Sequence, residues 1–236
     1  MKPAKIVLIT GASSGIGKAI AKELSIHGYE VILTARNKEK LVKVSEEIKE
    51  LGHTTHIIPC DISDENQVQN LFQESLKIGF VSSIINNAGF GKFSSIHNVK
   101  IEDWDNQINT NLRGAFLVTQ KFVSNMMEKK EGNILFINSV AGKYGYPYSA
   151  AYVASKFGLK GFADSIRNEL REYNIKVISI HPGAINTNFW DNLDSKFNKD
   201  DMLNPNSIAK YAFQAINSDD DDVVEEIVIR RTAGDF

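Results

Sequence analysis

The chain has 236 residues, of which 42% are hydrophobic and 24% are charged, and it carries a formal net charge of −2. This length and composition are ordinary for a globular protein with a sizeable core, and we expect one domain over residues 1–236. The near-neutral charge offers no electrostatic attraction for nucleic acid or for an anionic membrane surface, so we expect neither partner.

A single cysteine, Cys60, excludes an internal disulfide and a metal site built from several cysteines, and we expect no bound metal. A lone, apolar-type cysteine fits a reducing compartment. The apolar run at 6–9 is too short for a signal peptide or a membrane span, and no other run approaches the needed length. We therefore expect a cytoplasmic protein.

Short β-rich runs alternate with longer helical patterns along the chain. The strands are expected at 5–10, 30–35, 55–60, 81–86, 133–138, 175–181 and 223–230. The helices are expected at 16–27, 38–51, 61–77, 101–127, 149–173 and 206–217. This alternation predicts an α/β fold, a Rossmann-like doubly wound parallel sheet of about seven strands with helices on both faces. The near-continuous apolar runs in the strands are typical of a sheet that is covered on both sides.

A glycine-rich stretch, TGASSGIG at 10–17, follows the first expected strand and opens the first expected helix. Gly11 allows a tight turn, Gly15 lets the backbone approach a pyrophosphate, and Gly17 lets the helix pack closely on the strand. The free N–H groups and the dipole at the helix start favour an anion there. Glycine-rich turns are common, but this position in an α/β chain favours dinucleotide binding over a plain turn.

The end of the second expected strand distinguishes the two nicotinamide cofactors. Enzymes that use NAD usually place an acid there to bind the ribose 2′-hydroxyl. Here the sequence reads Thr34-Ala35-Arg36, and the Arg36 guanidinium suits a 2′-phosphate instead. We therefore predict NADP(H) as the cofactor, the alternative being that Arg36 is only a surface arginine.

Tyr152 and Lys156 are four residues apart, which places both side chains on one face of a helix. A lysine ammonium roughly 4 Å from a phenol, at an effective dielectric near 20, favours the tyrosinate by about 4 kcal/mol. That is enough to bring the tyrosine pKa from about 10 to near 7. The pair alone occurs by chance in many helices, so its meaning depends on the other motifs.

Several further motifs stand at the ends of expected strands or in expected helices. They are Asp61 after the third strand, NNAG at 86–89, N-x-x-G at 111–114, Ser139, and PG at 182–183. In this order, and with Ser139 thirteen positions before Tyr152, they resemble the short-chain dehydrogenase/reductase family in its single-domain, NADP(H)-type branch. The resemblance covers nearly the whole chain, from 5 to 230.

The resemblance implies a catalytic set of four residues. Tyr152 would be the acid/base that protonates the carbonyl oxygen as hydride arrives, and Lys156 would lower its pKa and hold the nicotinamide ribose. Ser139 would hydrogen-bond the substrate oxygen, although a serine at a strand end can instead cap a turn. Asn111 would hold a water that links Lys156 to solvent, a task that fits an asparagine in mid-helix, where it is otherwise unfavourable.

The resemblance also implies the cofactor contacts. Asp61 and Ile62 would flank the adenine, although Asp61 taken alone reads better as a helix cap. Pro182, Gly183 and Thr187 would border the nicotinamide. The full set of expected contacts is Gly11, Ser13, Ser14, Gly15, Ile16, Gly17, Arg36, Asp61, Ile62, Asn87, Ala88, Gly89, Tyr152, Lys156, Pro182, Gly183 and Thr187.

The leading interpretation is an NADPH-dependent carbonyl reductase, reversible as an alcohol dehydrogenase, that acts on a small-molecule ketone or aldehyde. One alternative is a 3-oxoacyl-thioester reductase, whose acidic carrier protein would need a basic docking face. The candidates for that face are Arg113, Lys121, Lys129, Lys130, Arg167 and Arg171. An alternative of another class is a non-catalytic NADP(H)-sensing protein, against which the intact Ser139, Tyr152 and Lys156 argue.

Substrate selection is expected in residues 90–97, 140–151 and 184–204. The last of these resembles a lid with an apolar underside or, equally, a surface loop whose aromatic residues dock on the core. The apolar residues concerned are Phe90, Phe93, Tyr144, Tyr146, Tyr148, Phe189, Trp190, Leu193, Phe197 and Met202. They suggest a hydrophobic or planar carbonyl compound. The end of the chain also resembles reductases of broad carbonyl specificity, including pteridine-type ones.

The resemblance to the short-chain dehydrogenase/reductase family also implies an oligomer. We expect a homodimer or homotetramer that pairs through the helices at 101–127 and 149–173.

Overall fold

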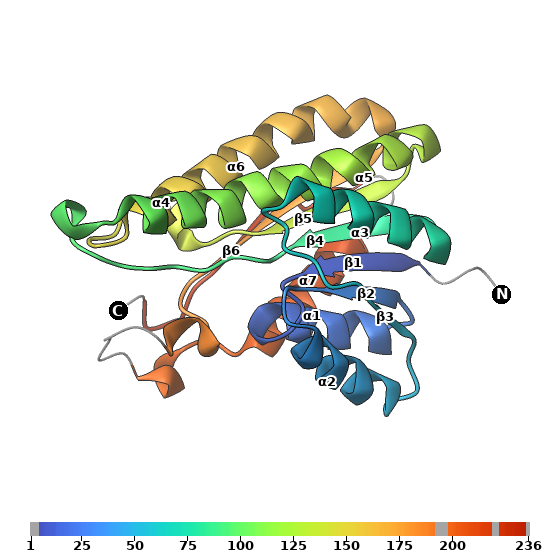
Figure 1. Ribbon diagram of the computed structural model, residues 1–236, viewed down its shortest axis with the longest axis horizontal. Helices are drawn as coiled ribbons and strands as arrows, with labels where there is room; N and C mark the ends of the chain where they lie inside the picture. The colour runs from blue at the N-terminus through green and yellow to red at the C-terminus, as the bar shows by residue number, and fades with distance from the viewer. Residues whose placement is uncertain (1–4, 192–197, 219–221, 235–236) are drawn as a thin grey trace.

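The computed structural model describes residues 5–191, 198–218 and 222–234 and contains a seven-stranded parallel sheet with helices on both faces (Figure 1). The strand order across the sheet is β3-β2-β1-β4-β5-β6-β7. The strands are β1 (Ile6–Thr10), β2 (Glu30–Thr34), β3 (Thr55–Ile57), β4 (Val81–Asn86), β5 (Gly132–Ile137), β6 (Ile175–Pro182) and β7 (Glu226–Ile229). The helices are α1 (Gly15–Ile26), α2 (Lys38–Lys49), α3 (Glu65–Ile78), α4 (Ile101–Ile108), α5 (Ala115–Lys129), α6 (Ala150–Leu170) and α7 (Pro205–Ile216).

Two apolar layers hold the helices to the sheet. Successive strand residues point to opposite faces, so Val7 and Ile9 of β1 enter the layer under α1, α2 and α7, while Leu8 enters the layer under α3, α5 and α6. All three side chains are fully buried. The predicted doubly wound α/β fold is therefore confirmed. No helix among the described residues is both long enough and apolar enough to cross a membrane.

The long helix expected at 101–127 is interrupted. It consists of α4, a π-helical segment (Asn109–Gly114) and α5. The Asn111 side chain forms hydrogen bonds with the main chain of Phe90 in a neighbouring loop, and the wider π turn accommodates this inward-pointing side chain. The long helical region expected at 101–127 is therefore present, with a π turn that the sequence pattern does not indicate.

The third helix also begins later than expected. Its N-cap is Asp64, whose carboxylate accepts hydrogen bonds from the N–H groups of Asn66 and Gln67, at 2.9 and 3.2 Å. The reading of Asp61 as the helix cap is therefore wrong. The third and last strands are shorter than expected, because they lie at the edges of the sheet and have a partner on one side only.

The strand order reverses beside β1, which pairs with β2 on one side and β4 on the other. In an open α/β sheet, a ligand binds across the carboxyl ends of the strands at such a reversal. The loops that follow β1 and β4 meet there, and they carry the glycine-rich stretch and the NNAG motif.

Candidate active site

The loops after β1 and β4 are joined by the side chains of Thr10 and Asn87. The Thr10 hydroxyl accepts hydrogen bonds from the N–H groups of Asn87 (2.9 Å) and Ala88 (3.0 Å). In return, the Asn87 amide donates to the carbonyl oxygens of Thr10 (2.9 Å) and Gly11 (3.2 Å). Both loops are therefore held in one fixed arrangement at the carboxyl edge of the sheet.

The glycine-rich loop is too tightly packed for larger residues. Gly11 has a φ of +64°, and a Cβ there would lie 2.8 Å from the Ala88 Cα. A Cβ on Gly17 would lie 2.4 Å from the Gly11 carbonyl oxygen, since α1 starts directly against the turn. The Ser14 side chain, at the N-cap, makes no capping hydrogen bond, so the first N–H groups of α1 are left for another acceptor.

The end of β6 reaches the same loop from the other side. A Cβ built on Gly15 would lie 3.1 Å from the Thr187 methyl group, so Thr187 lies directly against the phosphate-type turn. Gly183 follows β6 and donates its N–H to the Ile229 carbonyl oxygen of β7 at 2.8 Å. The structure thus brings the expected 182–187 group next to the glycine loop.

A polar hollow of about 450 Å³ lies at the far end of this edge. It contains Arg36 and Asp61, two of the expected adenosine-side residues. The Asp61 carboxylate accepts hydrogen bonds from the Ser63 N–H (3.0 Å) and hydroxyl (2.7 Å), which fixes its direction. Ile62 is buried against Gly114 of the π segment. The hollow is lined by Arg36, Asp61, Ser63, Phe90, Asn106, Asn109, Thr110 and Arg113.

Tyr152, Lys156 and Ser139 meet at the centre of the edge. The first turns of α6 place Tyr152 and Lys156 on one face, and the Lys156 ammonium lies 5.8 Å from the centre of the Tyr152 ring. Ser139 lies just beyond the end of β5, and its side chain faces Tyr152 closely enough to lower the pKa of the phenol slightly against the effect of burial. Its hydroxyl oxygen accepts from the Ala141 N–H at 3.1 Å, so Ser139 caps the turn that follows, as one of its two sequence interpretations expected.

Burial governs both titratable groups at this centre. Lys156 is 4% exposed and its ammonium donates to the Ile137 carbonyl oxygen at 3.0 Å. Burial lowers the pKa of Lys156 to about 8. Burial likewise raises the pKa of Tyr152 to about 12, against a smaller opposite effect of the Ser139 hydrogen bond. The expectation that Lys156 brings the Tyr152 pKa near 7 is therefore wrong for the protein without a bound cofactor, since burial penalises the tyrosinate more than the distant ammonium stabilises it.

Asn111 connects the tyrosine–lysine helix to the loop after β4. Its amide nitrogen donates to the Phe90 carbonyl oxygen (2.9 Å) and to the Ser155 hydroxyl (3.0 Å), and its amide oxygen accepts from the Phe90 N–H (3.0 Å). A Cβ on Gly89 would lie 3.0 Å from the Asn111 amide oxygen and 3.7 Å from the Lys156 nitrogen. The four expected catalytic positions therefore lie in one connected cluster.

Aromatic side chains cover the exposed side of Tyr152. The ring centres of Phe93 and Phe189 lie 5.8 and 5.6 Å from that of Tyr152, and 6.0 Å from each other. Trp190 packs edge-on against Phe189 and donates its indole N–H to the Ile185 carbonyl oxygen at 2.8 Å. The aromatic residues of 188–190 thus dock on the site itself. Leu193 and Phe197 lie outside the described residues.

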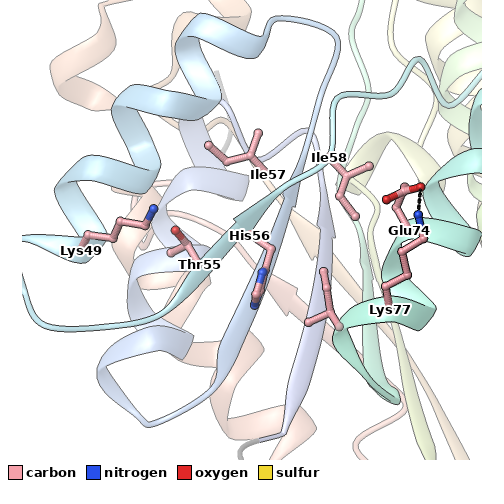
Figure 2. A pocket seen from close by; sticks show the side chains of 8 residues that line it. Lys49, Thr55, His56, Ile57, Ile58, Glu74 and Lys77 are labelled. Atoms are coloured by element: carbon pink, nitrogen blue, oxygen red, sulfur yellow. Dashed lines mark hydrogen bonds and ion pairs between the residues drawn. The ribbon is translucent and has the colours of Figure 1, made fainter.

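A second hollow, of about 400 Å³, lies between β3 and the last turns of α2 and α3 (Figure 2). In a parallel α/β sheet, each connecting helix runs back and ends near the amino end of the next strand. This hollow therefore lies at the amino edge of the sheet, opposite the carboxyl edge that carries Tyr152. Its lining includes Lys49, His56, Glu74 and Lys77, with Lys77 and Glu74 paired at 2.6 Å. No expected site residue lies in it.

Comparison with known proteins identifies this arrangement. The sequence profile described as short chain dehydrogenase matches residues 5–198. The chain belongs to the short-chain dehydrogenase family. A sepiapterin reductase of Chlorobaculum tepidum is 36% identical over 98% of both chains. A 3-oxoacyl-[acyl-carrier-protein] reductase of Staphylococcus aureus is 36% identical over 89% of this chain and 86% of its own.

Solved structures of the family superpose on nearly the whole chain. An alcohol dehydrogenase of the archaeon Thermococcus sibiricus, complexed with 5-hydroxy-NADP, has a TM-score of 0.90 at 28% identity, over 98% of this chain and 97% of that one. A metagenomic short-chain oxidoreductase in complex with NADP has a TM-score of 0.86 at 33% identity, over 97% of both chains. This short-chain dehydrogenase is accordingly an oxidoreductase of that family.

Sequence reasoning missed several residues that shape the site. Thr10 joins the two cofactor-side loops, Arg113 donates to the Ser63 carbonyl oxygen at 2.7 Å, and His181 contacts the main chain at Ser139. Thr10 was visible as the first letter of the glycine motif. For Arg113 and His181, no local pattern indicates a contact with a partner many positions away.

The buried ammonium yields a stability prediction. Because its folded pKa of about 8 lies below its unfolded value, charged Lys156 destabilises the folded state fully below pH 8, and the effect fades as pH rises to about 10.5. Lys156→Met should therefore raise the free energy of unfolding at pH 7 by up to about 3 kcal/mol, less the lost hydrogen bond to Ile137. Urea denaturation at pH 7 and pH 10.5 measures this.

The matched control is Lys129→Met, which removes an exposed lysine from α5 and should leave stability nearly unchanged. A Lys156→Met protein that is less stable than the wild type at pH 7 would contradict the assigned cost of burial.

Proposed function

We propose that this short-chain dehydrogenase is an NADPH-dependent carbonyl reductase that works as one domain, with Tyr152 as the proton donor. The observation that carries the proposal is the meeting of Ser139, Tyr152 and the buried Lys156 at the carboxyl edge of the sheet, where a dinucleotide would lie across the strand reversal. Two hydroxyl groups that meet at one point can both donate to a single carbonyl oxygen.

The residues at the carboxyl edge fit NADP(H). A closely packed glycine turn, which a Cβ on Gly17 would fill, opens onto the uncapped start of α1 and suits a pyrophosphate. Arg36 is exposed in the polar hollow and suits a 2′-phosphate, while Asp61 and Ile62 suit the adenine. Two structural neighbours, of 33% and 28% identity, are complexes with NADP or its 5-hydroxy derivative, which supports the same cofactor here.

The remaining proposed contacts follow the same edge toward Tyr152. Asn87, Ala88 and Gly89 would line the middle of the groove, and Pro182, Gly183 and Thr187 its nicotinamide end. When bound, NADPH would supply the hydride. Lys156 would hold the nicotinamide ribose, since its ammonium lies near Gly89 at that end.

The protein's own residues would handle the proton. With a pKa of about 12, Tyr152 keeps its proton throughout the physiological range and can give it to the oxygen of a carbonyl as that oxygen gains charge. Ser139 would donate a second hydrogen bond to the same oxygen. Lys156, still protonated at neutral pH, would stabilise the tyrosinate that remains, and Asn111 would hold the water that returns a proton.

The aromatic cover favours a planar or apolar carbonyl substrate. Phe93 and Phe189 stand against the Tyr152 ring, so a substrate that reaches the Tyr152 hydroxyl would lie between aromatic faces. The similarity to a sepiapterin reductase supports the same class.

A 3-oxoacyl-thioester is the second candidate, because several 36%-identical relatives are 3-oxoacyl-[acyl-carrier-protein] reductases. Fewer cations are free for the basic docking face that an acidic carrier would need. The side chains of Arg113, Arg167 and Arg171 are engaged in hydrogen bonds or ion pairs within the chain. A sensor protein without catalysis would not need the Ser139–Tyr152 contact.

We also propose a homodimer or homotetramer that pairs through α5 and α6. Phe116 and Phe157, on these helices, are large apolar side chains that are exposed in the isolated chain. Light scattering at micromolar concentration should give at least twice the chain mass of 26.3 kDa, and a monomer would contradict the pairing.

Tyr152→Phe should reduce turnover by roughly 10²–10⁴-fold, because it removes the positioned acid and keeps the ring. NADPH oxidation is measured against aldehydes, diketones, pteridines and acetoacetyl thioesters, and NADPH binding by fluorescence should stay unchanged. The control is Tyr211→Phe, which removes a hydroxyl from an exposed residue of α7 that belongs to no expected site segment. Near-normal turnover by Tyr152→Phe would refute the proton-donor role.

Arg36→Ala should weaken NADPH binding roughly ten- to a hundred-fold, the value of a charged hydrogen bond to a phosphate, and leave NADH binding almost unchanged. Lys49→Ala, at the other end of α2, removes a cation far from the hollow and serves as the control. Equal losses for both cofactors in Arg36→Ala would sink the assignment of Arg36 to the 2′-phosphate.

A further inference from the structure

His181 is a fully buried histidine that holds the main chain at Ser139. It lies next to the end of β6 with 0% of its side chain exposed, and its Nδ1 is 3.1 Å from the Ser139 carbonyl oxygen. A carbonyl oxygen can only accept, so Nδ1 carries the hydrogen and donates. Among the described residues, its other ring nitrogen makes no hydrogen bond and faces the Glu226 carboxylate at 3.8 Å.

Glu226 is where the charged groups around His181 converge. It begins the edge strand β7, and its carboxylate pairs with Lys143 and, at 3.2 Å, with Lys160. Lys143 directly follows the short turn Val140–Gly142 that Ser139 caps. Lys160 lies one turn beyond Lys156 on α6. One half-buried carboxylate thus joins two segments, the turn after Ser139 and α6, to the edge strand β7.

The charges in this group are settled at neutral pH. Burial alone would raise the pKa of Glu226, but hydrogen bonds from Lys143 and Lys160 hold it below the usual range, so the carboxylate is ionised. Burial lowers the pKa of His181, which keeps the ring neutral. The carboxylate therefore acts through its ion pairs with the two lysines, and His181 acts through its single donated hydrogen bond.

The turn after Ser139 is buried against α6, and it also holds its shape through three hydrogen bonds of its own. Its protected N–H groups are those of Ala141, bonded to the Ser139 hydroxyl, of Gly142, bonded to the Ser139 carbonyl oxygen, and of Lys143, bonded to the Val140 carbonyl oxygen. If the turn opens, the Ser139 hydroxyl loses both the Ala141 N–H and its direction toward Tyr152. An anchor at Lys143 therefore limits how the hydroxyl can move.

We propose that Glu226 is a positioning residue for the reaction: its ion pair with Lys143, together with the hydrogen bond from His181 to the Ser139 carbonyl oxygen, fixes the main chain at Ser139 and in the turn that follows, and so aims the Ser139 hydroxyl at Tyr152. The proposal rests on the proposed function. Glu226 contacts neither the Ser139 nor the Tyr152 side chain, so it would act only through Lys143 and the other residues next to it. A misplacement of about 1 Å at a reacting group can cost on the order of a hundred-fold in rate.

The first test is hydrogen exchange of the ligand-free protein over the segment 138–144, followed by mass spectrometry. Glu226→Ala should speed exchange of the turn amides by roughly ten-fold, and Lys143→Met should do the same from the other side of the ion pair. Lys143→Met also keeps the test decisive if Glu226→Ala folds poorly. The control is Glu225→Ala, which removes the neighbouring carboxylate that pairs with Arg171 on the surface. Unchanged exchange in both Glu226→Ala and Lys143→Met would overturn the proposal.

The second test separates positioning from general damage. With the carbonyl compound that the wild type reduces, Glu226→Ala and Lys143→Met should lower kcat roughly ten- to a hundred-fold, while NADPH binding by fluorescence and turnover in Glu225→Ala stay close to wild type. A normal kcat, or an equal loss in Glu225→Ala, would overturn the proposal. A wild type that reduces none of the tested carbonyls would refute the proposed function instead, and the exchange comparison would still decide whether Glu226 orders the Ser139 turn.

Discussion

The burial of one lysine ammonium constrains the centre of this protein more than any other interaction. Lys156 is 4% exposed, and burying a charge is costly unless polar groups surround it. The Ile137 carbonyl oxygen accepts a hydrogen bond from the ammonium, and Gly89 lies beside the ammonium nitrogen. The Asn138 side-chain amide donates to the main-chain carbonyl oxygen of Lys156 at 3.2 Å. The end of β5 and the loop after β4 are therefore held in place around the buried ammonium. The same burial holds the proton on Tyr152.

The two halves of the sheet contribute different parts of the site. The β1–β4 junction, joined by Thr10 and Asn87, builds a rigid turn suited to phosphate. The end of β5 and the first turns of α6 carry the groups suited to proton transfer. The π segment Asn109–Gly114 connects them, because Asn111 bonds beside Lys156 while Gly114 packs against Ile62. A rigid arrangement of this kind favours orientation of two reactants over flexibility at the reacting atoms.

Much of the fold could be predicted, because alternating apolar runs and glycine stops are local signals. The motif residues were also predictable by position, since each follows a strand or lies on a helix that ends at one edge. The interruption at Asn111 was not, because it depends on hydrogen bonds to Phe90, twenty-one positions away. Asp61 and Asp64 are equally suitable helix caps by residue type, and only the position at which the backbone becomes helical shows that Asp64 is the cap. The Tyr152 pKa depends on depth of burial, and the Glu226 contacts join distant segments, so neither has a local pattern.

Transfer of a hydride from NADPH to a carbonyl carbon, with Tyr152 as proton donor, can be tested with isotope-labelled cofactor. The wild type is incubated with NADPH that carries deuterium at the reactive C4 hydrogen and with each carbonyl compound of the panel, and the product alcohol is examined by mass spectrometry and NMR. We expect one deuterium on the carbinol carbon of at least one substrate class, and none when Tyr152→Phe replaces the wild type over the same time. NADPH that binds tightly but transfers no deuterium to any class, or equal transfer by Tyr152→Phe, would contradict this expectation.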